Sequence, residues 1–145
     1  MKVLLDTNIL VRLVARQAPE HAEVVRAITS LLSRGDDPVI AAQVLIELWV
    51  VATRPTNVNG FGWTPAQAHR AVVDFRGQFT LLEDTPSVFT HWLTLVTTHA
   101  VEGKRAHDAR LAATMLAHRV DTLLTLNPRD FAAFSGITVL QPNDL

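Results

Sequence analysis

Three acidic residues stand in segments that are otherwise apolar, where a buried charge is costly. Asp6 ends a short apolar run at the start of the chain, and Glu47 lies in the apolar stretch 44–51. Asp108 lies on the apolar side of the segment 107–113. An ionised carboxylate on an apolar face needs a partner that neutralises it. A hard divalent cation is the simplest partner that all three can share, because it prefers oxygen ligands.

Each acid also has an ordinary structural explanation. Asp6 could cap the following helix, because Asp is a favoured N-cap residue. Asp108 could stabilise a helix dipole by about 0.3–1 kcal/mol, or pair with Arg105 or Arg110. Glu47 could point to solvent, but no Lys or Arg lies three or four residues away to pair with it. Because Glu is rarely buried unless it is paired, we favour a functional role for Glu47.

Polar residues beside the acids could complete such a site. Thr7 and Asn8 directly follow the first acid and could hold it by hydrogen bonds, as residues behind a metal ligand commonly do. Asn127 and Asp130 follow another apolar run. Asn127 precedes a proline and could instead cap a helix. Asp130 could accept hydrogen bonds from backbone amides or help to bind a second cation.

Other motifs narrow the range of enzymes. Six histidines show no zinc-binding spacing. His107 could touch substrate because it adjoins Asp108, but an ordinary surface or partly buried histidine is the simpler interpretation. The sequence has no serine-hydrolase elbow, P-loop or dinucleotide fingerprint. Several basic residues could contact phosphates in a metal-dependent phosphodiesterase or could be solvated surface charge: Arg54, Lys104, Arg105, Arg110 and Arg129.

Length and composition indicate one globular domain over residues 1–145, with 48% hydrophobic and 19% charged residues. The lack of cysteine excludes disulfides and thiolate zinc sites. A net charge of −1 gives no support to nucleic-acid binding but does not exclude it, because a local basic rim and a cation can serve one cleft. No signal peptide is visible, and the apolar runs fall short of the roughly 18 residues that span a bilayer. We therefore expect a cytoplasmic protein without a membrane partner.

Strand and helix patterns alternate along the chain. The predicted strands are Val3–Leu5, Pro38–Ala41, Thr80–Leu82, Thr122–Leu126 and Thr138–Leu140. The predicted helices are Asn8–Arg16, Pro19–Ser33, Gln43–Thr53, Thr64–Gln78, Pro86–Ala100, Arg105–His118 and a short one at Pro128–Phe134. This alternation predicts a parallel sheet covered on both faces, with function at the carboxyl ends of its strands. Asp6, Asn127 and Asp130 all follow predicted strands.

The segment Arg54–Trp63 interrupts the helical pattern with two glycines and two aromatic residues. A surface loop with Phe61 and Trp63 packed down explains it most simply. A contact surface for a second subunit or a partner protein is the alternative.

Four segments together resemble PIN-domain nucleases. The residues that carry the resemblance are 4–10 around the first acid, 44–48 around the second, 107–113 around the third, and the closing run 124–131. Each motif alone is weak, but the ordered set is fairly specific and covers nearly the whole chain.

The resemblance implies a three-layer α/β/α sandwich with a central, mainly parallel five-stranded sheet. It implies a Mg²⁺- or Mn²⁺-dependent endoribonuclease that hydrolyses RNA phosphodiester bonds. Chains of this size are similar to VapC-type toxins of toxin–antitoxin pairs, which are usually homodimers held inactive by a small antitoxin. The fourth acidic position of the family is often Asp. Here Asn127 matches it, and Asp130 follows three residues later. The sequence therefore leaves open whether the site binds one metal ion or two.

Residue roles follow from the resemblance and from metal chemistry. We expect Asp6 and Asp108 to bind the cation directly, and Glu47 to bind it through water or to orient the attacking water. Asn127 or Asp130 would assist a second ion. The residues expected to contact substrate or to support the ligands are Thr7, Asn8, Thr125, Arg105 and Arg110.

Two other functions are compatible with parts of this pattern. A phosphatase with Asp6 as its nucleophile would need a second Asp two residues later, where Asn8 stands. An inactive PIN-like module that binds RNA or protein would keep the fold and need none of the acids.

Overall fold

The computed structural model describes all 145 residues. Its centre is one sheet of five parallel strands in the order β3-β2-β1-β4-β5. The strands are β1 (Lys2–Leu5), β2 (Asp37–Ala41), β3 (Thr80–Leu82), β4 (Thr122–Leu124) and β5 (Thr138–Leu140). The predicted five-stranded parallel sheet is therefore confirmed.

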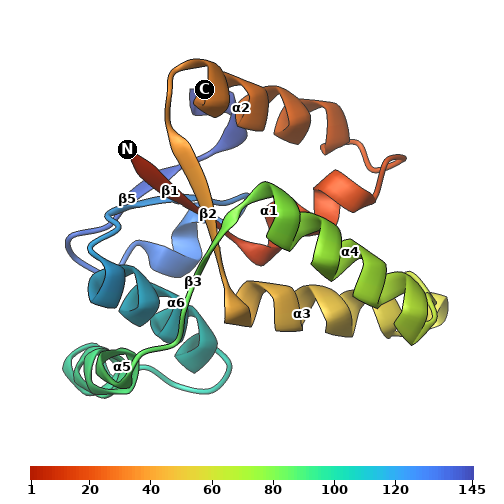
Figure 1. The fold of residues 1–145 in the computed structure, drawn as a ribbon. Helices are drawn as coiled ribbons and strands as arrows, with labels where there is room; N and C mark the ends of the chain where they lie inside the picture. The colour runs from red at the N-terminus through yellow and green to blue at the C-terminus, as the bar shows by residue number, and fades with distance from the viewer.

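Helices cover both faces of this sheet (Figure 1). The α-helices are α1 (Thr7–Val14), α2 (His21–Ser33), α3 (Ala42–Thr53), α4 (Pro65–Gln78), α5 (Pro86–Thr98) and α6 (Arg105–His118), and the 3₁₀ helices are η1 (Thr56–Val58), η2 (Pro128–Phe131) and η3 (Pro142–Asp144). Helices α5 and α6 lie on one side of the sheet, and α1 to α4 lie on the other. This arrangement confirms the predicted sandwich. None of the helices has the length and apolar character needed to cross a bilayer.

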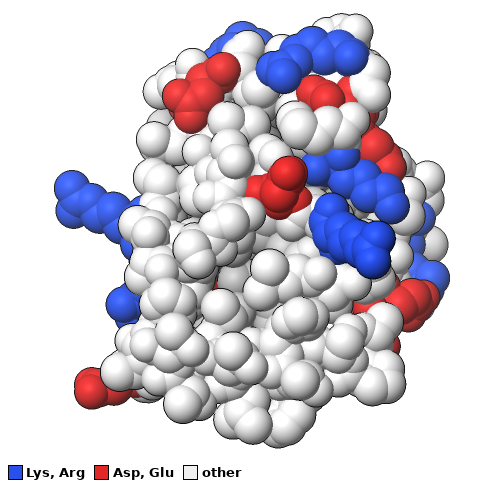
Figure 2. All heavy atoms as spheres, turned by 90° about the vertical axis from the view of Figure 1, so that its left-hand side faces the viewer, with Lys and Arg blue, Asp and Glu red and all other residues white.

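The outer side of α5 carries no charge. Helix α5 contains no Lys, Arg, Asp or Glu, and Phe89 and Leu93 are 64% and 50% exposed. Figure 2 shows that charged side chains gather in the upper half of this side of the molecule, while its lower half is largely uncharged.

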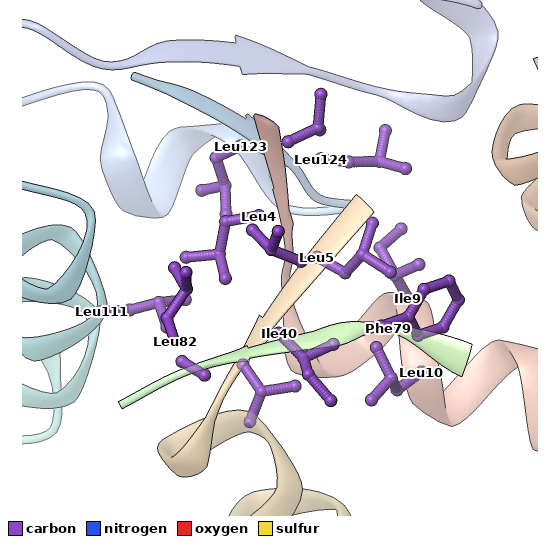
Figure 3. Close-up of a cluster of buried hydrophobic side chains, with 14 of the residues drawn as sticks. Leu4, Leu5, Ile9, Leu10, Ile40, Phe79, Leu82, Leu111, Leu123 and Leu124 are labelled. Atoms are coloured by element: carbon purple, nitrogen blue, oxygen red, sulfur yellow. The ribbon is translucent and has the colours of Figure 1, made fainter. Parts of the chain in front are cut away.

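The core is built around the central strand. Val3, Leu4 and Leu5 of β1 are fully buried, which fits a strand that helices cover on both faces. Figure 3 shows Leu4 and Leu5 among apolar side chains from the neighbouring strands and from α1. Burying one such side chain stabilises the fold by about 1.5–3 kcal/mol. This packing fixes the carboxyl end of β1, where Asp6 stands.

The strand order reverses direction at β1. The chain first adds β2 and β3 on one side of β1, and then β4 and β5 on the other. In open α/β sheets such a switch point leaves a crevice beyond the carboxyl ends of the two strands that flank it. The two segments that face this crevice follow β1 and β4, and they carry Asp6 and Asn127.

Some predicted boundaries differ from the structure. The fourth strand ends at Leu124, two residues earlier than predicted, and the next residue, Thr125, donates its hydroxyl group to Asp6. The predicted helix Pro128–Phe134 is instead the four-residue 3₁₀ helix η2. Helix α1 runs over Thr7–Val14 and so begins and ends earlier than predicted.

The segment between α3 and α4 folds back on the end of α3. The backbone amides of Phe61 and Trp63 donate hydrogen bonds to carbonyl groups of α3, and the two rings lie 5.3 Å apart. A Cβ atom at Gly60 would lie 1.9 Å from the carbonyl oxygen of Arg54, so this close approach requires glycine. The fold-back brings Asn59 beside Arg54, whose guanidinium group donates to the Asn59 carbonyl oxygen at 3.0 Å.

Candidate active site

Asp6 joins the central strand to the first helix. It is the N-cap of α1, and its Oδ1 accepts a hydrogen bond from the Thr7 backbone amide at 2.7 Å. Its Oδ2 accepts from the Thr125 hydroxyl at 2.7 Å and from Asn8 Nδ2 at 3.3 Å. Asp6 therefore serves as a cap, and its second oxygen is held toward the end of β4.

Thr125 and Asn8 connect the ends of β1 and β4. The Thr125 hydroxyl donates to Asp6 and accepts from Asn8 Nδ2 at 3.2 Å and from the Asn127 backbone amide at 3.0 Å. Asn8 Oδ1 accepts from the Leu126 amide at 3.0 Å. These bonds hold the segment after β4 against the start of α1, and Thr125 itself is fully buried.

Glu47 reaches the same place from α3. Its Oε2 accepts a hydrogen bond from the Thr7 hydroxyl at 2.6 Å, and its Oε1 accepts from Gln43 Nε2 at 2.9 Å. Gln43 lies four residues earlier, which puts both side chains on one face of the helix. Both Glu47 oxygens are thus oriented, and each keeps further capacity to accept a hydrogen bond.

Asp108 and Asp130 approach from the other side of the sheet. Asp108 lies in the first turn of α6, and Asp130 lies in η2. Asp108 makes no salt bridge. Arg110 instead pairs with Asp84 at 3.0 Å. Arg105 acts on Asp108 only as a nearby positive charge.

One cavity of about 580 Å³ brings most of these side chains together. Its lining residues are Asp6, Thr7, Asn8, Val11, Arg12, Glu47, Val51, Arg54, Asn59, Asp108, Asn127 and Asp130. All five predicted metal-binding residues belong to this set. Thr125 does not line the cavity but donates a hydrogen bond to Asp6, which does. Neither Arg105 nor Arg110 lines the cavity.

Crowding of carboxylates perturbs two of them. Burial, followed by the charges of Asp130, Asp6 and Glu47, raises the pKa of Asp108 to about 6, against a smaller opposing effect of Arg105. Burial also raises the pKa of Asp6. Hydrogen bonds from Thr125 and Thr7 oppose this shift in the pKa of Asp6, while the charges of Glu47 and Asp130 add to it. The acids therefore act on one another across one cavity.

The donor set fits a hard divalent cation. Four carboxylates line the cavity together with side-chain amides that include Asn127, and Mg²⁺ and Mn²⁺ prefer such oxygen ligands. No three Asp, Glu or His side chains are arranged as a formed metal-binding group. The support for a cation therefore comes from ligand chemistry and from the uncompensated negative charge.

Arg12 and Gln43 belong to the site and were not singled out from the sequence, whereas Arg54 was named there as a possible phosphate contact. Arg12 and Arg54 line the cavity, and Arg12 pairs with Glu20 at 3.1 Å. Arg54 has no carboxylate partner. The glutamine, Gln43, lies one helical turn before Glu47, and that spacing was the only available indication of its position.

Comparison with known proteins places the chain in a family. A family model described as the PIN domain matches residues 3–137. The chain belongs to the PIN domain family. It is also 32% identical to Ribonuclease VapC24 of Mycobacterium tuberculosis, over 95% of this chain and 94% of that protein. The resemblance inferred from the four motifs is therefore confirmed.

Solved structures share this PIN fold at low sequence identity. A chain of VapBC-1 from nontypeable Haemophilus influenzae superposes with a TM-score of 0.72 at 19% identity and covers 99% of both chains. A chain of a toxin–antitoxin complex from Klebsiella pneumoniae gives a TM-score of 0.63 at 22% identity, with 97% of both chains covered. At this level of identity the likeness establishes the fold.

The raised pKa of Asp108 predicts a loss of stability with rising pH. Because the pKa of Asp108 is about 6 in the folded state, above the ordinary value of 3.8 for an aspartate, folding favours its protonated form. Its contribution is fully present below pH 4 and is lost as the pH rises through about 6. Urea unfolding in EDTA from pH 4 to 8 should show that Asp108→Asn gains stability relative to the wild type across this window, with a constant difference above about pH 7.

The exposed Asp74 on α4 supplies the control for this titration. Asp74→Asn should follow the wild-type curve in parallel. Parallel curves for Asp108→Asn as well would show that Asp108 does not titrate in the folded state as described.

Proposed function

We propose that this PIN domain is a metal-dependent endoribonuclease and the toxin of a toxin–antitoxin pair. The observation that carries the proposal is the gathering of Asp6, Glu47 and Asp108 around one cavity at the switch point of the sheet. The name of the relative from M. tuberculosis, a ribonuclease, supports RNA as the substrate.

Asp6 and Asp108 are the residues that would hold the cation, either Mg²⁺ or Mn²⁺. When bound, such an ion lowers the pKa of an attacking water and screens the charge of the phosphate. Asp6 suits this role because its Oδ2 is fixed by Thr125 and Asn8. Asn127 or Asp130, which also line the cavity, would assist a second ion.

Glu47 is placed to orient the attacking water. Thr7 and Gln43 each occupy one position on its carboxylate, so the remaining lone pairs point in fixed directions. The water oxygen would form a bond to phosphorus while the P–O bond on the opposite side breaks. This in-line displacement needs no covalent enzyme intermediate, which separates it from a phosphatase with an Asp6 nucleophile.

Arg54 supplies positive charge to the cavity, whose other lining arginine, Arg12, is paired with Glu20. It lacks a carboxylate partner, and its guanidinium group is held by the carbonyl oxygen of Asn59. A fixed arginine is well suited to contact phosphate oxygens. We propose that Arg54 binds a phosphate of the RNA next to the cleaved bond.

A small antitoxin protein is the proposed partner. The support is that similar structures are VapBC complexes, and one is named a toxin–antitoxin complex. The uncharged outer side of α5, with the exposed Phe89 and Leu93, is the proposed contact for a second copy of this chain.

RNA cleavage should depend on Mn²⁺ or Mg²⁺ and on the acids. Loss of a residue that only supports a metal ligand lowers activity or metal affinity by about 10–100-fold. Asp6 and Asp108 are the proposed ligands themselves, so Asp6→Asn and Asp108→Asn should lower cleavage of a structured RNA by more than about 100-fold. EDTA should abolish the wild-type activity. Circular dichroism establishes that the variants fold, and Asp74→Asn serves as the active control. Full cleavage by a folded Asp108→Asn variant would contradict the proposal.

Bacterial growth provides the test of the toxin and partner. Expression of the wild type should slow growth, whereas Asp108→Asn should not, because growth arrest requires RNA cleavage. Co-expression with the protein encoded by a small neighbouring reading frame should restore growth, and the two proteins should purify together. Equal growth arrest by the wild type and by Asp108→Asn would contradict a toxicity based on nuclease activity.

A further inference from the structure

Gln43 is a buried polar side chain that lies behind the cavity, between α3 and α6. It lies in the first turn of α3, and only 7% of its surface is exposed. It does not line the cavity itself. A buried amide is costly unless its hydrogen bonds are made, so its partners indicate why it is there.

Three hydrogen bonds satisfy the Gln43 amide. Its Nε2 donates to Glu47 Oε1 at 2.9 Å and to the His107 carbonyl oxygen at 2.8 Å. Its Oε1 accepts from Arg110 Nη1 at 3.1 Å. A carboxylate and a carbonyl can only accept, and a guanidinium can only donate. The orientation of the amide is therefore determined by its partners.

Arg110 is in turn fixed by a carboxylate beyond the site. Its Nη2 donates to Asp84 at 3.0 Å, and Asp84 follows the end of β3. A continuous chain of hydrogen bonds thus runs from Asp84 through Arg110 and Gln43 to Glu47. It starts just beyond the end of the outer strand β3 and ends at the cavity.

This chain of hydrogen bonds links α3, which carries Glu47, to α6, which carries Asp108. Glu47 belongs to α3, and His107, whose carbonyl group Gln43 binds, directly precedes Asp108 in α6. Helices α3 and α6 belong to opposite layers of the sandwich. A side chain that binds both helices can therefore set the separation of Glu47 and Asp108.

We propose that Gln43 is a positioning residue that holds Glu47 and the start of α6 in the arrangement that binds the cation, and that Arg110 acts through Gln43. This inference rests on the proposed metal-dependent function and assigns Arg110 a supporting role in place of a phosphate contact. Residues behind metal ligands commonly act in this way.

Binding of Mn²⁺ without RNA tests the inference directly. Gln43→Met keeps the length of the side chain and removes its hydrogen bonds. The Kd for Mn²⁺, measured by calorimetry or electron paramagnetic resonance, should rise 10–100-fold, as for other residues behind a metal ligand. Thr114→Val is the matched control. It also removes a buried hydrogen bond of α6, from its hydroxyl to the Arg110 carbonyl oxygen at 3.1 Å, and should leave the Kd unchanged.

A double variant separates positioning from substrate contact. Arg110→Met should raise the Mn²⁺ Kd less than Gln43→Met does, and Gln43→Met with Arg110→Met should bind Mn²⁺ no more weakly than Gln43→Met alone. Because Arg110 is partly exposed, its variant tests the chain of hydrogen bonds even where Gln43→Met does not fold.

The outcomes distinguish this inference from the proposed function. Wild-type protein that binds no Mn²⁺ would overturn both. Tight Mn²⁺ binding by the wild type and unchanged binding by Gln43→Met, or by Arg110→Met alone, would overturn only the positioning role. Additive effects of the two substitutions would likewise overturn it, because Arg110 would then act independently of Gln43.

Discussion

Repulsion among carboxylates in one cavity is the constraint on which this molecule depends. Asp6 and Asp108 both have pKa values that burial and neighbouring acids raise. Such an arrangement weakens the folded state, so it persists only where the surrounding structure compensates. Hydrogen bonds from Thr7, Thr125 and Gln43 hold the acids in place. A cation that neutralises the cavity would turn this cost into a binding free energy.

The sheet explains why the acids meet at all. Because β1 lies at the switch point, the segments after β1 and β4 face each other across the sheet edge. The apolar core fixes those strands, and α3 and α6 then bring Glu47 and Asp108 from opposite layers. The hydrogen bonds of Gln43 join these two layers at the site itself.

Much of this could be predicted from the sequence, for identifiable reasons. The alternation of strand and helix patterns predicted the sheet, and the cost of burying Glu47 among apolar neighbours pointed to the cavity. The supporting contacts were harder to predict. Thr125 and Asn8 are 117 positions apart, so only the folded chain shows that they bond. Gln43 lies one helical turn before Glu47, so their proximity follows from the sequence. Its hydrogen bond to the His107 carbonyl oxygen depends instead on how α6 packs.

Direct titration of Asp108 by carboxylate carbon NMR tests the central claim most closely. In metal-free protein its pKa should be about 6. The pKa should fall in Asp130→Asn, which removes the neighbouring charge with the largest effect, and burial should keep it above 3.8. Saturating Mg²⁺ should lower it further. A pKa of Asp108 near 3.8 that neither Asp130→Asn nor Mg²⁺ changes would contradict the shared acidic cavity.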